Sequence, residues 1–271
     1  MASERIGFIG AGQMARAIAQ GLVRADMIRR EQIFASDPDA QARVAFEERV
    51  PGANVGAENL EVVSAADTII LAIKPQQMET VVDGIAAAVD DSKLLISIAA
   101  GVKLSQLSAQ LGDRSRLIRV MPNTPCLIGE GATGYALGAG ATAEDADFAD
   151  RMLRSVGHAF LLEEKLLDAV TALSGSGPAF FCAVLEALSD GGSQMGLPAD
   201  VANSLALQTM AGTAATLQAT GESPESLRKR VSSPGGTTLA GLAALESHSL
   251  HEALVAAIKA ATERSRELGN S

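Results

Sequence analysis

The sequence predicts an α/β N-terminal domain with a parallel-rich sheet, followed by an all-α C-terminal domain. Short apolar runs separated by helical stretches fill the first part of the chain. From about Lys165 onward these runs stop, and Ala/Leu-rich segments with helical spacing take over. Strands that alternate with helices imply a parallel sheet covered on both faces. We therefore expect two domains, residues 1–164 and 165–271.

The predicted strands are the short apolar runs of the first domain. They are Ile6–Gly10, Gln32–Ala35, Thr68–Ile73, Leu94–Ala99 and Arg116–Met121. Each is short enough for a buried strand. In this order they predict a doubly wound sheet whose ligand site lies at the carboxyl ends of the strands.

The predicted helices of the second domain have apolar residues at helical spacing. They are Ala179–Met195, Asp200–Ala219, Pro224–Lys229, Thr238–Leu245 and Leu250–Leu268. Gly196 to Pro198 and Gly221 to Pro224 each end one helix and begin the next. The segment 199–219 is apolar almost all round, which favours burial against a second subunit. The alternative is a central helix in a monomeric bundle.

Composition excludes several classes of protein. The chain has 271 residues, a net charge of -10 and 3% aromatic residues, so it would repel a nucleic-acid backbone and offers few stacking platforms. There is no uninterrupted apolar run long enough for a bilayer and no signal peptide, so we expect a cytoplasmic protein with no membrane contact. Cys126 and Cys182 are far apart in apolar surroundings, which indicates buried thiols rather than a disulfide or a zinc site.

A glycine-rich turn follows the first strand. Gly10, Gly12 and Ala15 form the pattern G-x-G-x-x-A between a strand and a helix. Gly10 permits the tight turn, Gly12 lets the backbone approach a pyrophosphate, and Ala15 lets the helix pack closely on the sheet. The amides that begin the helix would face the diphosphate of a dinucleotide.

The ends of the later strands give a mixed signal about the cofactor. Ser36 could donate to a 2′-phosphate, whereas Asp37 would repel one if it pointed inward, and no arginine follows immediately. Small residues after the third and fourth predicted strands leave room for a nicotinamide. Lys74 is ambiguous: a lysine at a strand end is more often solvated, but the following Pro75 fixes the turn that would aim its side chain.

Two glycine-proline segments precede helices in the second domain. Leu173–Pro178 would place Ser176 or Gly177 at a helix cap, and Val231–Thr238 leads into another helix. Such turns present backbone amides and hydroxyls that can hold a carboxylate without a cation. The spacing of His248 and His251 could form half of a metal site, but no third ligand is evident, so we expect no metal. Without an acid-base constellation, the cofactor would carry the difficult chemistry.

Together these motifs resemble the pyrroline-5-carboxylate reductases, the enzymes of the last step of proline biosynthesis. The resemblance covers essentially the whole chain through IGFIGAGQMA, AIKPQ, SIAAGV, RVMPNTP, DAVTALSGSGPAFF, LSDGGSQMGLP and SSPGGTTLAGL. It implies a Rossmann-type N-terminal domain, a helical C-terminal dimerisation domain, and homodimers that assemble into decamers. It also implies NADP as the preferred cofactor, with NAD as the alternative.

The resemblance also implies the residues of the site. Cofactor contacts fall on Ile9, Gly10, Ala11, Gly12, Gln13 and Met14 for the diphosphate, Ser36 for the 2′-phosphate, Asn59 for the adenosine, and Ala72, Ile73, Lys74, Pro75, Ile98, Ala99 and Ala100 for the nicotinamide side. Substrate contacts fall on Ser233, Gly235, Gly236, Thr237 and Thr238, with Thr238 as the catalytic residue that reaches the ring nitrogen. Glu164 matches an acidic position near the substrate in some members.

Arg230 departs from the family pattern, because relatives can carry an uncharged side chain there. It would either reach a phosphate of the cofactor in a neighbouring subunit or be a solvated cation at a helix end. The implied reaction is reduction of 1-pyrroline-5-carboxylate to L-proline. The alternatives are a reductase of another small cyclic imine, a β-hydroxyacid dehydrogenase, and a non-catalytic dinucleotide sensor. A β-hydroxyacid dehydrogenase should place a catalytic lysine on the first long interdomain helix. Only Lys165, at the margin of that helix, is available here.

Overall fold

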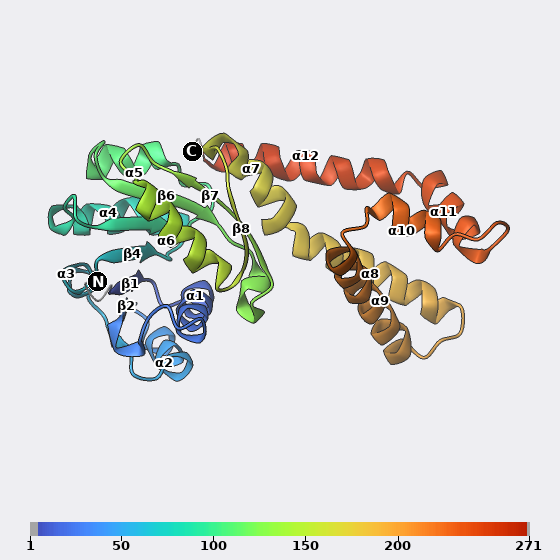
Figure 1. Cartoon of the computed structure of the whole chain (residues 1–271), viewed down its shortest axis with the longest axis horizontal. Helices are drawn as coiled ribbons and strands as arrows, with labels where there is room; N and C mark the ends of the chain where they lie inside the picture. Colours follow the sequence, from blue (N-terminus) through green and yellow to red (C-terminus); the bar gives the residue numbers. More distant parts are fainter. Residues whose placement is uncertain (1–4, 270–271) are drawn as a thin grey trace. The chain divides into compact units, whose positions relative to one another are not determined.

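The computed structural model describes residues 5–269, which form two compact units (Figure 1). The first unit comprises the described residues up to Ser176 together with those from Ala261 onward, and the second comprises Gly177–Ala260. These bounds differ from those of the predicted domains. The segment from Lys165 to Ser176 and the end of the last helix belong to the first unit.

A single eight-stranded sheet forms the centre of the first unit. Its strands are β1 (Ile6–Ile9), β2 (Ile33–Ser36), β3 (Asn54–Gly56), β4 (Thr68–Leu71), β5 (Leu94–Ser97), β6 (Arg116–Met121), β7 (Gly131–Leu137) and β8 (Gly157–Leu161). They lie in the order β3-β2-β1-β4-β5-β6-β7-β8. Strands β1 to β6 are parallel, β7 is antiparallel to β6, and β8 is parallel to β7. The strand order reverses between β1 and β4, which is where such sheets bind ligands.

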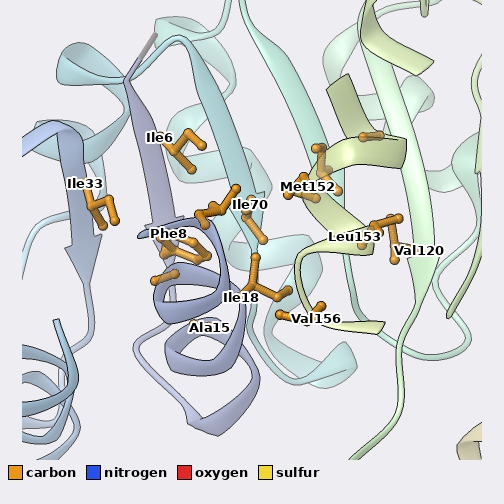
Figure 2. Packing of buried hydrophobic residues seen from close by; sticks show 14 of the residues in the cluster. Ile6, Phe8, Ala15, Ile18, Ile33, Ile70, Val120, Met152, Leu153 and Val156 are labelled. Atoms are coloured by element: carbon orange, nitrogen blue, oxygen red, sulfur yellow. The ribbon is translucent and has the colours of Figure 1, made fainter. Parts of the chain in front are cut away.

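Helices cover both faces of this sheet (Figure 1). They are α1 (Gln13–Arg24), α2 (Ala40–Arg49), α3 (Asn59–Ala65), α4 (Met78–Ile85), α5 (Leu104–Leu111), α6 (Ala143–Arg154) and α7 (Leu167–Val170). One hydrophobic core joins Phe8 and Ile70 of the sheet to Ile18 of α1 and Met152 of α6 (Figure 2). A second core on the other face joins the sheet to α3, α4, α5 and α7. The two-sided burial expected from the continuous apolar strands is therefore present.

Three strands were not predicted as such. β3 has three residues, of which Asn54 is exposed, and β7 is rich in glycine and small residues, so neither shows a clear apolar run. β8, which carries His158, follows the last predicted strand in the chain and was likewise not predicted. The two added strands at the far edge make the sheet mixed, although parallel pairing predominates.

The second unit is helical, as predicted. Its helices are α8 (Gly177–Gln194), α9 (Ala199–Thr220), α10 (Pro224–Arg230), α11 (Thr237–Ser247) and the first part of α12 (Leu250–Leu268). These bounds agree with the predicted ones to within about two residues, as is usual for helix ends. Helix α9 ends at Gly221, whose φ of 66° is left-handed and suits glycine.

Apolar side chains of the second unit are largely exposed. Among residues 177–260 only Gly177 and Ala202 are buried. Helix α9 exposes Leu205 and Leu207 by 54% and 53%, so it is not the centre of a monomeric bundle. Within residues 5–269, one helical stretch, Glu164–Gln194, is apolar enough to cross a membrane by length and composition alone. Glu186 and Asp190 interrupt it, which is why the sequence shows no uninterrupted apolar run there.

Candidate functional site

The glycine-rich turn joins β1 to α1 at the point where the strand order reverses. Gly10 has a φ of 98°, and a Cβ there would lie 2.5 Å from the Ala72 carbonyl oxygen. Gly12 is the residue before the first turn of α1 and has no side-chain cap. A Cβ on Gly12 would meet no atom of another described residue within 4 Å, apart from its chain neighbours. The turn therefore closes tightly against β4 at Gly10 and leaves open space at Gly12.

This turn fits the diphosphate of a dinucleotide. The open backbone at Gly12 and the amides at the start of α1 are suited to an anion. Ala15 is fully buried, so the helix packs closely on the sheet as expected. Ile9 and Ala11 are also fully buried, which leaves their backbone rather than their side chains available to a ligand.

Asp37, directly after β2, is tied to the glycine-rich turn. Its Oδ2 atom accepts a hydrogen bond from the Ala11 amide at 2.9 Å, and its Oδ1 atom accepts one from the Asp39 amide at 2.9 Å. The carboxylate thus already has backbone donors on both oxygens. It also places a negative charge beside the turn, where the adenosine ribose is expected.

Ser36 lies differently from the expectation of a hydroxyl facing a 2′-phosphate. Its side chain is fully buried, and its Oγ atom donates to Asn59 Oδ1 at 2.8 Å. Asn59 begins α3 and is half-buried. Ser36 therefore orients Asn59 in this structure, and a direct contact of Ser36 with a phosphate would require this hydrogen bond to break.

Arg43 is a cation near this edge that was not predicted from the sequence. It lies on α2, and its Nη1 atom donates to the carbonyl oxygens of Asp37 at 2.8 Å and Pro38 at 3.1 Å. The sequence has no arginine immediately after Asp37, which is where such a cation was expected. Arg43 instead lies one turn into α2, and its guanidinium reaches back to the end of β2.

The predicted nicotinamide stretches lie beside one another. β4 and β5 are neighbours, and the Ile98 amide donates to the Leu71 carbonyl at 3.2 Å. A cavity of about 820 Å³ in the first unit is lined by Pro75 and Ala100, together with residues of α5 and of the end of α12. Lys74 is exposed and precedes the turn that Pro75 begins. The strand ends and the cavity together form a crevice suited to a flat ring.

The first glycine-proline segment is helical, which corrects the expectation of a capped helix start at Ser176 or Gly177. A π-helical turn, Thr171–Gly175, connects α7 to α8, and the Ser176 amide donates to the Thr171 carbonyl at 2.8 Å. Pro178 has no N–H for the Ser174 carbonyl one turn earlier, and the side chain of Asn123 donates to that oxygen at 3.1 Å instead. This segment is therefore no carboxylate-binding turn.

The second glycine-proline segment does form a turn before a helix. Gly235 has a φ of 71°, and Gly236 precedes α11 without a side-chain cap. The Gly236 amide donates to the Ser233 carbonyl at 3.0 Å, and a Cβ on Gly236 would lie 2.5 Å from Ser233 Oγ. Thr237 and Thr238 are the first residues of α11, so their amides point out of the helix start. This arrangement is suited to a small carboxylate.

Arg230 and Glu164 both have partners within their own unit. Arg230 ends α10, with its Nη2 atom 2.8 Å from Glu222 Oε2. Hydrogen bonds from Arg230 and Ser226 lower the pKa of Glu222, and Glu222 raises the pKa of Arg230. Glu164 Oε1 lies 3.0 Å from Nη1 of Arg119. Neither side chain is free for a ligand without giving up a charged hydrogen bond.

The histidines do not gather into a site. His158 is exposed on β8, and the Nδ1 atom of His248 lies 3.1 Å from Ser247 Oγ at the end of α11. Within residues 5–269 there is no group of three His, Cys, Asp or Glu side chains arranged for a metal ion. Cys126 is buried and Cys182 is exposed, and both are free thiols; burial was expected for both, so Cys182 departs from it.

Comparisons with known proteins agree along the whole chain. A family model described as pyrroline-5-carboxylate reductase dimerisation matches residues 164–268, and one described as NADP oxidoreductase coenzyme F420-dependent matches residues 5–101. The pyrroline-5-carboxylate reductase of Arabidopsis thaliana is 43% identical over 270 residues, covering 99% of this chain and 97% of that protein.

Solved structures give the same result. The pyrroline-5-carboxylate reductase of Coxiella burnetii superposes with a TM-score of 0.92 at 34% identity and covers 98% of each chain. The pyrroline carboxylate reductase of Plasmodium falciparum, solved with NADP bound, has a TM-score of 0.88 at 33% identity and covers 99% of each chain. Similarity of this extent spans both compact units.

Proposed function

The chain belongs to the pyrroline-5-carboxylate reductase family, and from this premise we propose that it reduces 1-pyrroline-5-carboxylate to L-proline with NADPH or NADH. It is an oxidoreductase, and the reaction is the last step of proline biosynthesis. The full-length similarity to reductases of this name is the observation that carries the proposal. It favours this reaction over reduction of another cyclic imine, over a β-hydroxyacid dehydrogenase and over a dinucleotide sensor.

The cofactor in this proposal is NADP, with NAD as the alternative. The match of residues 5–101 to an NADP oxidoreductase model and the NADP in the Plasmodium falciparum structure support it. The turn from Ile9 to Met14 would hold the diphosphate, Asn59 the adenosine, and the strand-end stretches the nicotinamide. Ser36 would act on the 2′-phosphate through Asn59 in the present conformation. When bound, the nicotinamide supplies the hydride.

The substrate carboxylate would be held by the turn before α11. Ser233 would provide a hydroxyl, and Gly235 and Thr237 would provide backbone amides, while the Gly236 amide donates to the Ser233 carbonyl and would hold the turn in shape. Charge-assisted hydrogen bonds of this kind contribute about 1.5–3 kcal/mol each. The hydroxyl of Thr238 would orient the ring nitrogen and relay its proton. A protonated imine is already electrophilic, so the protein needs chiefly to position the ring and exclude water.

Two residues have less direct roles in this proposal. Glu164 would contribute a charge near the substrate, although its carboxylate also compensates Arg119. Arg230 would reach a cofactor phosphate only by leaving Glu222. The ion pair supports the interpretation of Arg230 as a cation at a helix end.

The proposed assembly is a homodimer formed by the helical domain, residues 165–271, with dimers assembled into a decamer. The match of residues 164–268 to a dimerisation model and the exposed apolar faces of α8 and α9 support the dimer. An exposed apolar stretch in a helix of such a domain is more simply covered by another subunit than by a membrane. We propose a cytoplasmic enzyme that binds neither membranes nor nucleic acid.

The test is an assay of the purified protein with 1-pyrroline-5-carboxylate, run in parallel with NADPH and NADH. Cofactor oxidation that depends on the substrate and forms proline in equal amount is the expected result. Cofactor binding without substrate-dependent oxidation would favour the sensor instead. Activity only with a different cyclic imine would replace the substrate and keep the reaction class.

A further inference from the structure

Arg119 is a buried cation outside the residues assigned to cofactor or substrate. It lies on β6, and its side chain is 5% exposed. Its Nη1 atom lies 3.0 Å from Glu164 Oε1, and its Nη2 atom lies 3.9 Å from Asp168 Oδ1. A planar guanidinium can face two carboxylates at once, which a lysine ammonium on a flexible stem does less well.

Each of these carboxylates holds a further segment of the chain. Glu164 Oε1 accepts a hydrogen bond from the Leu104 amide at 2.7 Å, which is the first amide of α5. Asp168 Oδ1 accepts one from the hydroxyl of Ser265 on α12 at 2.8 Å, across 97 residues of sequence. Arg119 thereby connects β6 to the start of α5, to α7 and to the end of α12, all within the first unit.

Helices α5 and α12 line the 820 Å³ cavity, and α7 leads directly into a further lining residue. Helix α5 contributes Gln106 and α12 contributes Ser265 itself, while Thr171 follows directly after α7. Pro75 and Ala100, at the predicted nicotinamide side, belong to the same cavity. Buried Arg119 and the two half-buried carboxylates thus contact segments that line this cavity or adjoin its lining.

We propose that Arg119 is a positioning residue for hydride transfer: it holds α5, α7 and α12 in the arrangement that fits the nicotinamide end of the cofactor. The inference rests on the proposed function, because it takes the cavity to be that end of the active site. Arg119 acts through Glu164 and Asp168 and touches no reacting atom. A misplacement of about 1 Å can lower a rate about 100-fold, so a loosened wall would affect turnover strongly.

Arg116 offers a matched control on the same strand. Its Nε atom lies 3.0 Å from Oδ2 of Asp145, a buried carboxylate on α6. Burial raises the pKa of Asp145, but hydrogen bonds from Arg116 and Thr142 outweigh burial, so the pKa lies below its usual value. Arg116→Met thus also leaves a buried carboxylate without its cation, but on the face of the sheet that carries α1 and α6.

The experiment compares Arg119→Met with Arg116→Met in the full-length protein. Three quantities are measured: kcat and KM with 1-pyrroline-5-carboxylate, the Kd of ADP-ribose and its 2′-phosphate, and the melting temperature. ADP-ribose lacks the nicotinamide and reports on the glycine-rich turn and the adenosine side of the site. We expect Arg119→Met to lower kcat/KM about tenfold or more, with an unchanged Kd for ADP-ribose, and Arg116→Met to keep wild-type kcat.

A second variant separates positioning from stability. Arg119→Met/Asp168→Asn removes one of the two uncompensated charges, at a carboxylate with no proposed contact to the substrate, and keeps a side-chain oxygen for the Ser265 hydroxyl. If its melting temperature recovers while kcat/KM stays low, the positioning role is supported. If kcat/KM recovers with the melting temperature, Arg119 is merely stabilising and the proposal is wrong.

The remaining outcomes are also decisive. Wild-type kinetics in Arg119→Met, or equal losses in Arg119→Met and Arg116→Met, overturn the proposal while leaving the reductase function intact. An inactive wild-type protein overturns the proposed function itself and this inference with it. If Arg119→Met does not fold, the double variant alone decides by the same criterion.

Discussion

The two units differ in how much of their apolar surface they bury by themselves. The first unit has two hydrophobic cores, one on each face of its sheet, whereas only Gly177 and Ala202 are buried in the second. Both are expected to bind anions through glycine-rich turns, at Gly10–Gly12 and at Gly235–Gly236. A self-contained core and a glycine-rich turn are therefore separable, because the second unit has such a turn although its apolar helix faces are largely exposed.

The largest expected effect is on dimer formation, and it tests whether the exposed apolar face of the second unit differs in function from exposed apolar residues of the first. Leu205 on α9 and Val44 on α2 are 54% and 55% exposed, but Leu205 lies in an apolar groove of the second unit. Leu205→Glu should raise the dissociation constant of the dimer about 100-fold, because a charged group at the centre of an interface costs about 3 kcal/mol. Sedimentation equilibrium measures the change.

Val44→Glu is the control and should leave the dimer intact. Equal dissociation by both variants would mean that exposure alone does not distinguish the two units. An unchanged dimer in Leu205→Glu would place the interface elsewhere.

The next prediction concerns the turn of the second unit. Thr238→Ala should lower kcat about tenfold or more, because a positioned proton-relay hydroxyl is lost. Thr238→Ser keeps the hydroxyl and should retain most of the turnover. Steady-state kinetics with saturating cofactor measure both, and unchanged turnover in Thr238→Ala would remove Thr238 from the mechanism.

In the turn of the first unit, one glycine should matter for the backbone conformation and the other for the approach of the cofactor. Gly12→Ala adds a methyl group into open space and should keep the melting temperature while raising the Kd of NADP about tenfold. Gly10→Ala forces a left-handed residue against the Ala72 carbonyl and should cost about 1–3 kcal/mol of stability. Calorimetry and cofactor titration separate the two; equal NADP binding by Gly12→Ala and wild type would contradict the assigned site.

The smallest effect concerns the choice of cofactor. Asp37→Asn removes a negative charge beside the glycine-rich turn and should shift the ratio of kcat/KM for NADPH over NADH several-fold toward NADPH, about 1 kcal/mol or less in free energy. Arg43→Ala should shift the ratio the other way. A ratio unchanged in both variants would mean that neither charge faces the ribose.

Much of the fold follows from local sequence patterns. Residues such as Ile69 and Ile70, apolar on both faces of a strand, predict a buried parallel sheet, and Gly221 predicts a helix end. The prediction failed where local signals are weak or compete. β3 is too short to show a period, and Pro178 looks like a helix start because nothing in its neighbourhood reveals that Asn123 satisfies the Ser174 carbonyl.

The candidate site also has features that local sequence predicts and features that depend on tertiary contacts. The sequence by itself determined the turns at Gly10–Gly12 and Gly235–Gly236, the order of most strands and helices, and the family, because these depend on φ preferences, periodicity and motif spacing within short segments. Only the tertiary structure decided that Ser36 is buried against Asn59, that Asp37 accepts from the Ala11 amide and that Arg119 joins Glu164 to Ser265 through Asp168. The hydrogen bonds among these contacts join residues that lie 23 to 97 positions apart in the sequence. Burial and charge pairing select such partners only once the sheet has formed, because no local pattern brings them together.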